Sequence, residues 1–158
     1  MKLYKIILLF IMLPTIIIAN DKKKHEKSKT ISKNFSVNKN ATLYVNNKYG
    51  NVNVTTWNQN RIKIDVKITV KGSDINNVDK KLNAINVFFE ASDNLVEART
   101  KIESVKSNWS FWGNNNINYK INYFIKMPIT NNADLNNKYG TIELDKLEGK
   151  ANLNCDYG

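Results

Sequence analysis

Apolar and polar side chains alternate along most of the chain after about residue 34, with the period of a β-strand that buries one face. Two long segments show it best, residues 61–71 and residues 117–127, and Pro128 closes the second. Their predicted inward faces are Ile62, Ile64, Val66, Ile68 and Val70, and Ile117, Tyr119, Ile121, Tyr123, Ile125 and Met127. Shorter strands are expected near residues 42–46, 51–57, 86–91 and 94–101, the last two joined by a turn at Asp93–Asn94.

One segment has a helical period instead. Ser73 or Asp74 can cap a helix that runs to about Ile85, because their side chains can accept a hydrogen bond from the first helical turn. Its apolar stripe is Ile75, Val78, Leu82 and Ile85. The pattern therefore predicts a mostly-β fold with one helix packed over the sheet, occupying residues 34–158.

The chain repeats itself near its end. Residues 133–140 align with residues 151–158 at an offset of 18, and five of the eight positions are identical. The core of the pattern also occurs at residues 45–50, where it leads into another short apolar-polar alternation. Each copy predicts a short strand, an Asn-rich bend that ends in glycine, and in the two earlier copies a second strand. The repeated bend residues are Tyr49, Gly50, Tyr139, Gly140, Tyr157 and Gly158.

Two architectures fit this repeat. A strand-bend-strand unit every 18 residues is typical of one coil of a β-solenoid, in which Tyr139 would stack on Tyr157 and Leu135 on Leu153. The alternative is a hairpin sandwich in which similar turns recur by accident. Because Tyr157-Gly158 leads into no further strand, we expect the domain to be incomplete at its C-terminus, as a natural truncation or a fragment.

The N-terminus predicts export. Lys2 and Lys5 precede an apolar run from Ile6 to Ala19, so residues 1–19 have the form of a secretory signal peptide. The alternative is an uncleaved membrane anchor, since Ile17 is large for a cleavage motif. Residues 20–33 are rich in lysine and predict a basic, disordered spacer. We expect the domain in the periplasm or at the cell surface, with membrane contact only through an uncleaved signal peptide.

Composition excludes several functions. The net charge is +10, but the basic residues are nearly all lysine, and the rarity of arginine argues against nucleic-acid binding. One histidine and one cysteine leave little for a metal site, so no cofactor or metal is expected. Cys155 matches Asn137 in the preceding repeat and is expected at a bend or rim. Glu90, Glu97 and Glu103 have the period of a solvated strand face, so no catalytic residue is predicted.

An aromatic cluster is the candidate binding surface. Trp109, Phe111 and Trp112 precede a run of asparagines, and exposed aromatic rings with nearby amides can bind sugars or anchor a protein interface. The alternative is that these rings fold back to cover the end of the sheet layer.

The order of these features resembles the bacterial putative-adhesin (toast-rack) β-solenoid family of exported proteins. The resemblance covers residues 29–158: the segment Lys29–Phe35, the long alternating strand, the helix, the Trp-Phe-Trp-Gly-Asn segment, Met127-Pro128 and the repeated Asn-Lys-Tyr-Gly. It implies an exported β-solenoid, and it carries over no activity and no catalytic residue.

The function predicted from the sequence is therefore a non-catalytic adhesin or cell-envelope interaction module. Its partner is unknown, a glycan or a cell-envelope protein being the candidates. Two alternatives stay open at this point: an extracytoplasmic sensory or regulatory domain, and a polysaccharide-processing enzyme, which would need a carboxylate-lined cleft.

Overall fold

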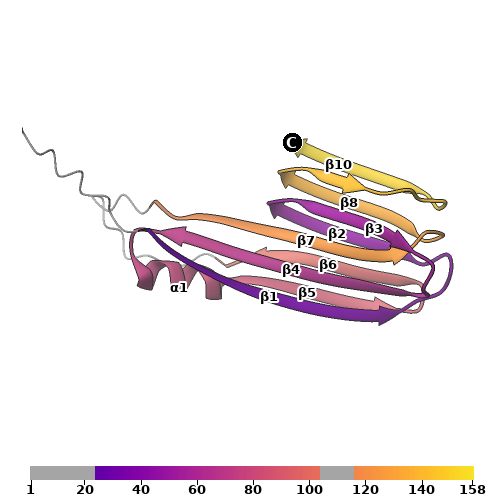
Figure 1. Cartoon of the computed structure of the whole chain (residues 1–158), viewed down its shortest axis with the longest axis horizontal. Helices are drawn as coiled ribbons and strands as arrows, with labels where there is room; N and C mark the ends of the chain where they lie inside the picture. The colour runs from indigo at the N-terminus through magenta and orange to yellow at the C-terminus, as the bar shows by residue number, and fades with distance from the viewer. Residues whose placement is uncertain (1–23, 104–115) are drawn as a thin grey trace, which may run out of the picture.

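A computed structural model describes residues 24–103 and 116–158, which form two five-stranded sheets and one helix (Figure 1). The elements are β1 (His25–Ser36), β2 (Thr42–Tyr49), β3 (Val52–Trp57), β4 (Arg61–Gly72), α1 (Ile75–Ala84), β5 (Ile85–Ser92), β6 (Leu95–Ile102), β7 (Asn118–Pro128), β8 (Asn132–Tyr139), β9 (Ile142–Leu144) and β10 (Ala151–Tyr157). The predicted mostly-β class with one helix is confirmed.

The strand order differs from that of a simple hairpin meander. Sheet A has the order β1-β4-β7-β3-β9, and sheet B has the order β10-β8-β2-β6-β5. In sheet A, β4 pairs antiparallel with β1 and β7, while β3 pairs parallel with β7 and β9. In sheet B, β5 and β6 pair antiparallel, and the other neighbours pair parallel. Inward side chains of both sheets form one hydrophobic core. Chain segments far apart in sequence therefore lie side by side.

The alternating segments form the centre of this core. In β4, all five predicted inward side chains are fully buried, and in β7 the four from Ile121 to Met127 are buried as well. A fully buried aliphatic side chain stabilises a fold by about 1.5–3 kcal/mol. The polar residues between them face solvent, which explains why these two strands follow the period of two so closely.

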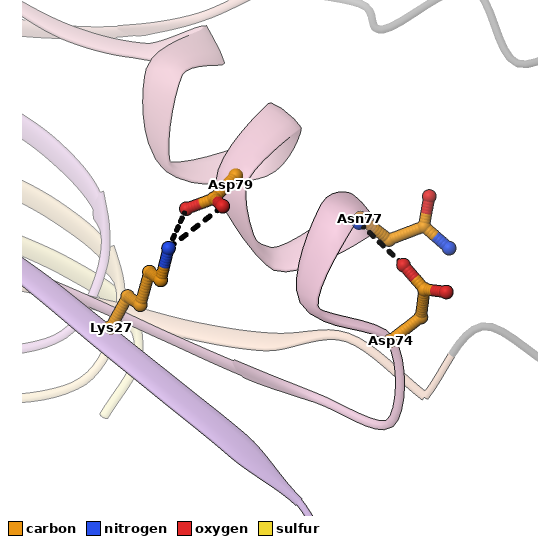
Figure 2. A network of polar contacts seen from close by, with 4 residues as sticks. All are labelled: Lys27, Asp74, Asn77 and Asp79. Carbon is orange, nitrogen blue, oxygen red and sulfur yellow. Dashed lines mark hydrogen bonds and ion pairs between the residues drawn. The ribbon is translucent and has the colours of Figure 1, made fainter.

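The helix starts at the predicted cap. The Asp74 carboxylate accepts a hydrogen bond from the backbone N–H of Asn77 at 2.8 Å, which satisfies one of the free donors of the first turn (Figure 2). Val78 and Leu82 are buried against the sheet, as predicted from the stripe. Lys27 of β1 contacts Asp79 at 2.7 Å; because both side chains are over two-fifths exposed, this ion pair adds little stability.

The prediction of a disordered spacer over residues 20–33 is wrong for residues 25–33. These residues belong to β1, which pairs antiparallel with β4 from His25–Gly72 to Ser36–Arg61. The physical reason is that β4 would otherwise expose a row of unpaired backbone groups, and backbone pairing needs no apolar side chain. Lys29 is partly buried there, and desolvation lowers the pKa of its ammonium group.

The repeat stacks as predicted. β10 pairs parallel with β8, and Leu153 lies directly beside Leu135. Parallel pairing excludes the hairpin alternative for this segment, because a hairpin makes antiparallel strands. The earlier copy joins the same stack: β2 pairs parallel with β8, so that Val45 lies beside Leu135 and Tyr49 beside Tyr139.

In residues 24–103 and 116–158, the structure contains no helix with the length and hydrophobicity needed to span a membrane.

Candidate functional site

The predicted site residues have different outcomes. Trp109, Phe111 and Trp112 lie outside the described residues, so their role stays a prediction.

The tyrosines of the three bends come together in one column. The ring centroids of Tyr49 and Tyr139 are 5.1 Å apart with an interplanar angle of 13°. Those of Tyr139 and Tyr157 are 5.1 Å apart at 16°, which confirms the predicted stacking.

Two glycines let the chain reverse beside this column. Gly50 and Gly140 have φ of +113° and +125°, values that side-chain-bearing residues rarely adopt. The Gly50 N–H donates to the carbonyl of Tyr139 at 2.9 Å, and the Gly140 N–H donates to that of Tyr157 at 3.3 Å. Each bend is thus hydrogen-bonded to the next, and the tyrosine spacing follows from that of the backbone.

The column continues onto sheet A through Tyr119. Its ring meets that of Tyr49 edge-on, with centroids 5.0 Å apart. Burial, and to a smaller extent a hydrogen bond with Tyr49, raises the pKa of Tyr119 to about 12. Burial also raises the pKa of Tyr123, deep in the core, while its hydrogen bond with Thr100 acts in the opposite direction. Both groups therefore stay neutral in the folded protein at physiological pH.

Alkaline pH is expected to destabilise the protein partly through Tyr119. Its folded pKa of about 12 exceeds its ordinary value of 10.0, so its contribution to stability is complete below pH 10 and falls as the pH rises toward 12. The thermal midpoint of the Tyr119→Phe variant should consequently fall less steeply over this range than that of the parent chain. Equal slopes for the two proteins would contradict the assignment.

A second feature lies on the outward face of sheet B. A shallow cavity of about 450 Å³ opens where β2, β8 and β10 run parallel, and we call it the amide groove. It is lined by Tyr44, Asn46, Asn47, Lys48, Thr100, Asn136, Asn137, Lys138, Asn154 and Asp156. Parallel register places Asn46 beside Asn136, and Asn136 beside Asn154. The three strands therefore present a row of outward amides, one from each strand.

The groove begins where two strands separate. The paired register of β2 and β6 ends at Asn46 and Arg99. Just beyond this point, the Thr100 hydroxyl donates to the amide oxygen of Asn47 at 3.1 Å, and Thr100 also shares a hydrogen bond of 2.7 Å with the Tyr123 hydroxyl. Side chains thus connect the two strands where the backbone ladder no longer does.

Two buried amides lie beneath the groove, on the inner face of β2 and β8 that points toward sheet A, and we call them the floor. Asn47 and Asn137 are 2% and 3% exposed. The Asn47 amide donates to the carbonyl of Ile121 at 3.0 Å and to the side-chain oxygen of Asn137 at 3.2 Å. Asn137 in turn donates to the carbonyl of Gly50 at 2.8 Å. A fully hydrogen-bonded floor of this kind is rigid, because each amide has one satisfied orientation.

Cys155 takes the same place in the third strand. It pairs with Asn137, and its thiol donates to the carbonyl of Gly140 at 2.9 Å, as the Asn137 amide donates to that of Gly50. Cys155 thus lies within β10 and not at a bend, exposed on the last strand of the stack, and its thiol replaces the Asn137 amide as the hydrogen-bond donor.

The rim of the groove is chemically different from its floor. Asn46 and Asn154 are exposed, and their amides have no hydrogen-bond partner among the described residues. Asn136 donates to the Asp134 carboxylate at 3.0 Å. Lys48 and Lys138 each extend over the ring of the tyrosine that follows them, at 5.4 and 5.7 Å from the centroid. The rim therefore offers free donors and acceptors at fixed positions.

Of the three glutamates that the sequence places on a solvated strand face, two are exposed and Glu97 is largely covered. Glu90 and Glu103 are exposed, and Glu97 is held by Arg99 at 2.9 Å. In the described ranges 24–103 and 116–158, no group of three His, Cys, Asp or Glu side chains gathers that could hold a metal ion. The groove can therefore bind through hydrogen bonds, but its lining offers no acid-base pair across a cleft.

The sequence contains one sign of the groove, a repeated triplet, which the 18-residue repeat period does not explain. The triplet Asn-Asn-Lys occurs at residues 46–48 and 136–138, 90 residues apart. This offset is a multiple of 18, but the helix and long strands between the copies do not follow the period, so the sequence does not place the two triplets together. The structure does, by inserting β8 beside β2.

Comparison with known proteins gives limited similarity. No family model matches the chain, and no curated protein matches it in sequence. It is similar to the solved structure of a putative cell adhesion protein from Clostridium sporogenes, with 18% identity over 75% of this chain and 51% of that chain and a TM-score of 0.41. It is also similar to the solved structure of a putative adhesin from Bacteroides fragilis, with 15% identity over 80% of this chain and 55% of that chain and a TM-score of 0.35. The chain spans about half the length of these two structures.

Proposed function

We propose that this chain is a non-catalytic, exported binding module that adheres to the cell envelope or to another cell surface. The observation that carries the proposal is the amide groove: parallel, in-register strands place Asn46, Asn136 and Asn154 in one row across sheet B. A repeated surface suits a partner that is itself repetitive, because several weak contacts to one extended partner combine into a stable attachment.

Two further observations support a binding role over a catalytic one. The groove is lined by amides, a hydroxyl, lysines and one carboxylate, so it lacks the paired acids of a glycosidase. The apolar run from Ile6 to Ala19, preceded by Lys2 and Lys5, supports export. The aromatic cluster of the sequence analysis remains part of the proposal, as a second contact region.

The test is saturable binding of the labelled full chain to intact bacterial cells and to isolated envelope fractions. We expect binding, and we expect the triple variant Trp109→Ser, Phe111→Ser, Trp112→Ser to lose about tenfold or more in affinity with an unchanged circular-dichroism spectrum, since aromatic anchors dominate interfaces. Unchanged affinity would remove the aromatic cluster from the proposal. No saturable binding of the parent chain to any fraction would overturn the proposed function itself.

A further inference from the structure

We propose that the amide groove binds an uncharged, linear oligosaccharide that runs across β2, β8 and β10. This inference rests on the proposed function and names the ligand class for the groove. It is carried by three properties of the described residues: free amides on the rim, nearly balanced charges around them, and a rigid floor beneath them.

The hydrogen-bonding groups of the rim match sugar hydroxyls. An asparagine amide both donates and accepts, and so does a hydroxyl, so one amide can bind a hydroxyl in either direction. Asn46 and Asn154 have both functions free, and Asn136 keeps its acceptor oxygen free while its amide nitrogen donates to Asp134. An apolar ligand would leave these groups unpaired, which costs binding free energy.

The charges around the groove nearly balance. The lining carries two ammonium groups and one carboxylate, those of Lys48, Lys138 and Asp156, and Asp134 on the outward face of β8 adds a second carboxylate beside it. On the neighbouring strand, the Arg99 guanidinium is paired with Glu97 and lies 4.9 Å from the Tyr44 ring centroid. An anionic polymer would need a net positive groove and a cationic one a net negative groove, so a neutral polyhydroxylated ligand fits best.

The row of amides also has a regular spacing. Neighbouring strands lie about 4.8 Å apart, so the three rim asparagines repeat at that interval across the sheet. An extended glycan presents its hydroxyls at a regular interval set by its sugar units, so consecutive units can meet consecutive strands. Because Asn47 and Asn137 bond to the carbonyls of Ile121 and Gly50, the strands that carry the rim asparagines are already held in place, and only the rim side chains need ordering on binding.

The test is isothermal titration of the full chain with neutral hexasaccharides (cellohexaose, chitohexaose, maltohexaose and mannohexaose), with hexagalacturonate as the acidic counterpart. We expect at least one neutral hexasaccharide to bind, with an affinity that does not change with ionic strength. The double variant Asn46→Ala, Asn136→Ala should lose about tenfold or more in affinity, as expected for two lost amides.

The matched control is the double variant Asn34→Ala, Asn118→Ala, which removes two exposed amides from the outward face of sheet A. It should bind as the parent chain does. Absence of binding to every neutral hexasaccharide, an equal loss in both double variants, or tighter and salt-sensitive binding of hexagalacturonate would each overturn the inference. Envelope binding without any hexasaccharide binding would overturn the ligand class alone and leave the proposed function standing.

Discussion

Replacing Gly50 with alanine is expected to lower the free energy of unfolding by about 3 kcal/mol or more. With φ at +113°, any side chain strains the backbone, and a Cβ atom would lie 2.5 Å from the carbonyl oxygen of Ile121 and 2.7 Å from the amide oxygen of Asn122. Relief of this contact requires β2 to move away from β7, which would also disturb the buried amides. Urea denaturation followed by tryptophan fluorescence measures the loss.

Gly72→Ala is the matched control, because it adds the same methyl group at a glycine whose φ is not positive. Its Cβ would lie 3.0 Å from a side-chain methyl of Val78 and 3.3 Å from a side-chain carbon of Ile117, with the backbone oxygen of Asn116 at an ordinary contact distance of 3.6 Å. The two side-chain groups can shift by a few tenths of an ångström, so we expect a smaller loss than at Gly50. A Gly50→Ala variant as stable as Gly72→Ala would show that the bend tolerates a side chain.

The hydrophobic pattern was sufficient for the parts of the fold in which burial decides the structure. β4 and β7 bury one face completely, so their period of two is visible in the sequence, and Asp74 marks the helix start through a specific cap. β1 escaped prediction because its place is determined by backbone pairing with β4, and its side chains are mostly exposed. Hydrophobic periodicity in a sequence arises from burial of one face of a strand, and an edge strand buries too little of either face to show it.

The amide groove could be predicted only in part for a related reason. The repeat showed that residues 133–140 and 151–158 are equivalent, and their parallel stacking followed from it. Nothing local showed that β2 joins the same stack, because that neighbour relation spans 90 residues and depends on how two sheets close around one core. Since the groove needs outward residues from all three strands, its existence depends on tertiary structure.

Replacing Asn47 with leucine is expected to cost about 3–5 kcal/mol, although leucine is similar in size and more apolar. The substitution leaves the carbonyl of Ile121 and the side-chain oxygen of Asn137 without their donor, and it removes the acceptor of the Thr100 hydroxyl. All three groups are at or near the buried floor, where water cannot easily replace the lost partner. Urea denaturation gives the free energy, and hydrogen exchange at the β2 and β8 amides shows whether the loss is centred there.

Asn46→Ala, at the preceding residue of the same strand, is the control that separates the floor from the rim. Its amide is exposed and makes no hydrogen bond within the described residues, so its removal should change the free energy of unfolding by no more than about 0.5 kcal/mol. Asn47→Leu should therefore destabilise the fold, while Asn46→Ala should affect only binding. If both variants were equally stable, the floor amides would contribute nothing to the stability of the strand stack, and the groove would lose the rigidity on which its ligand binding depends.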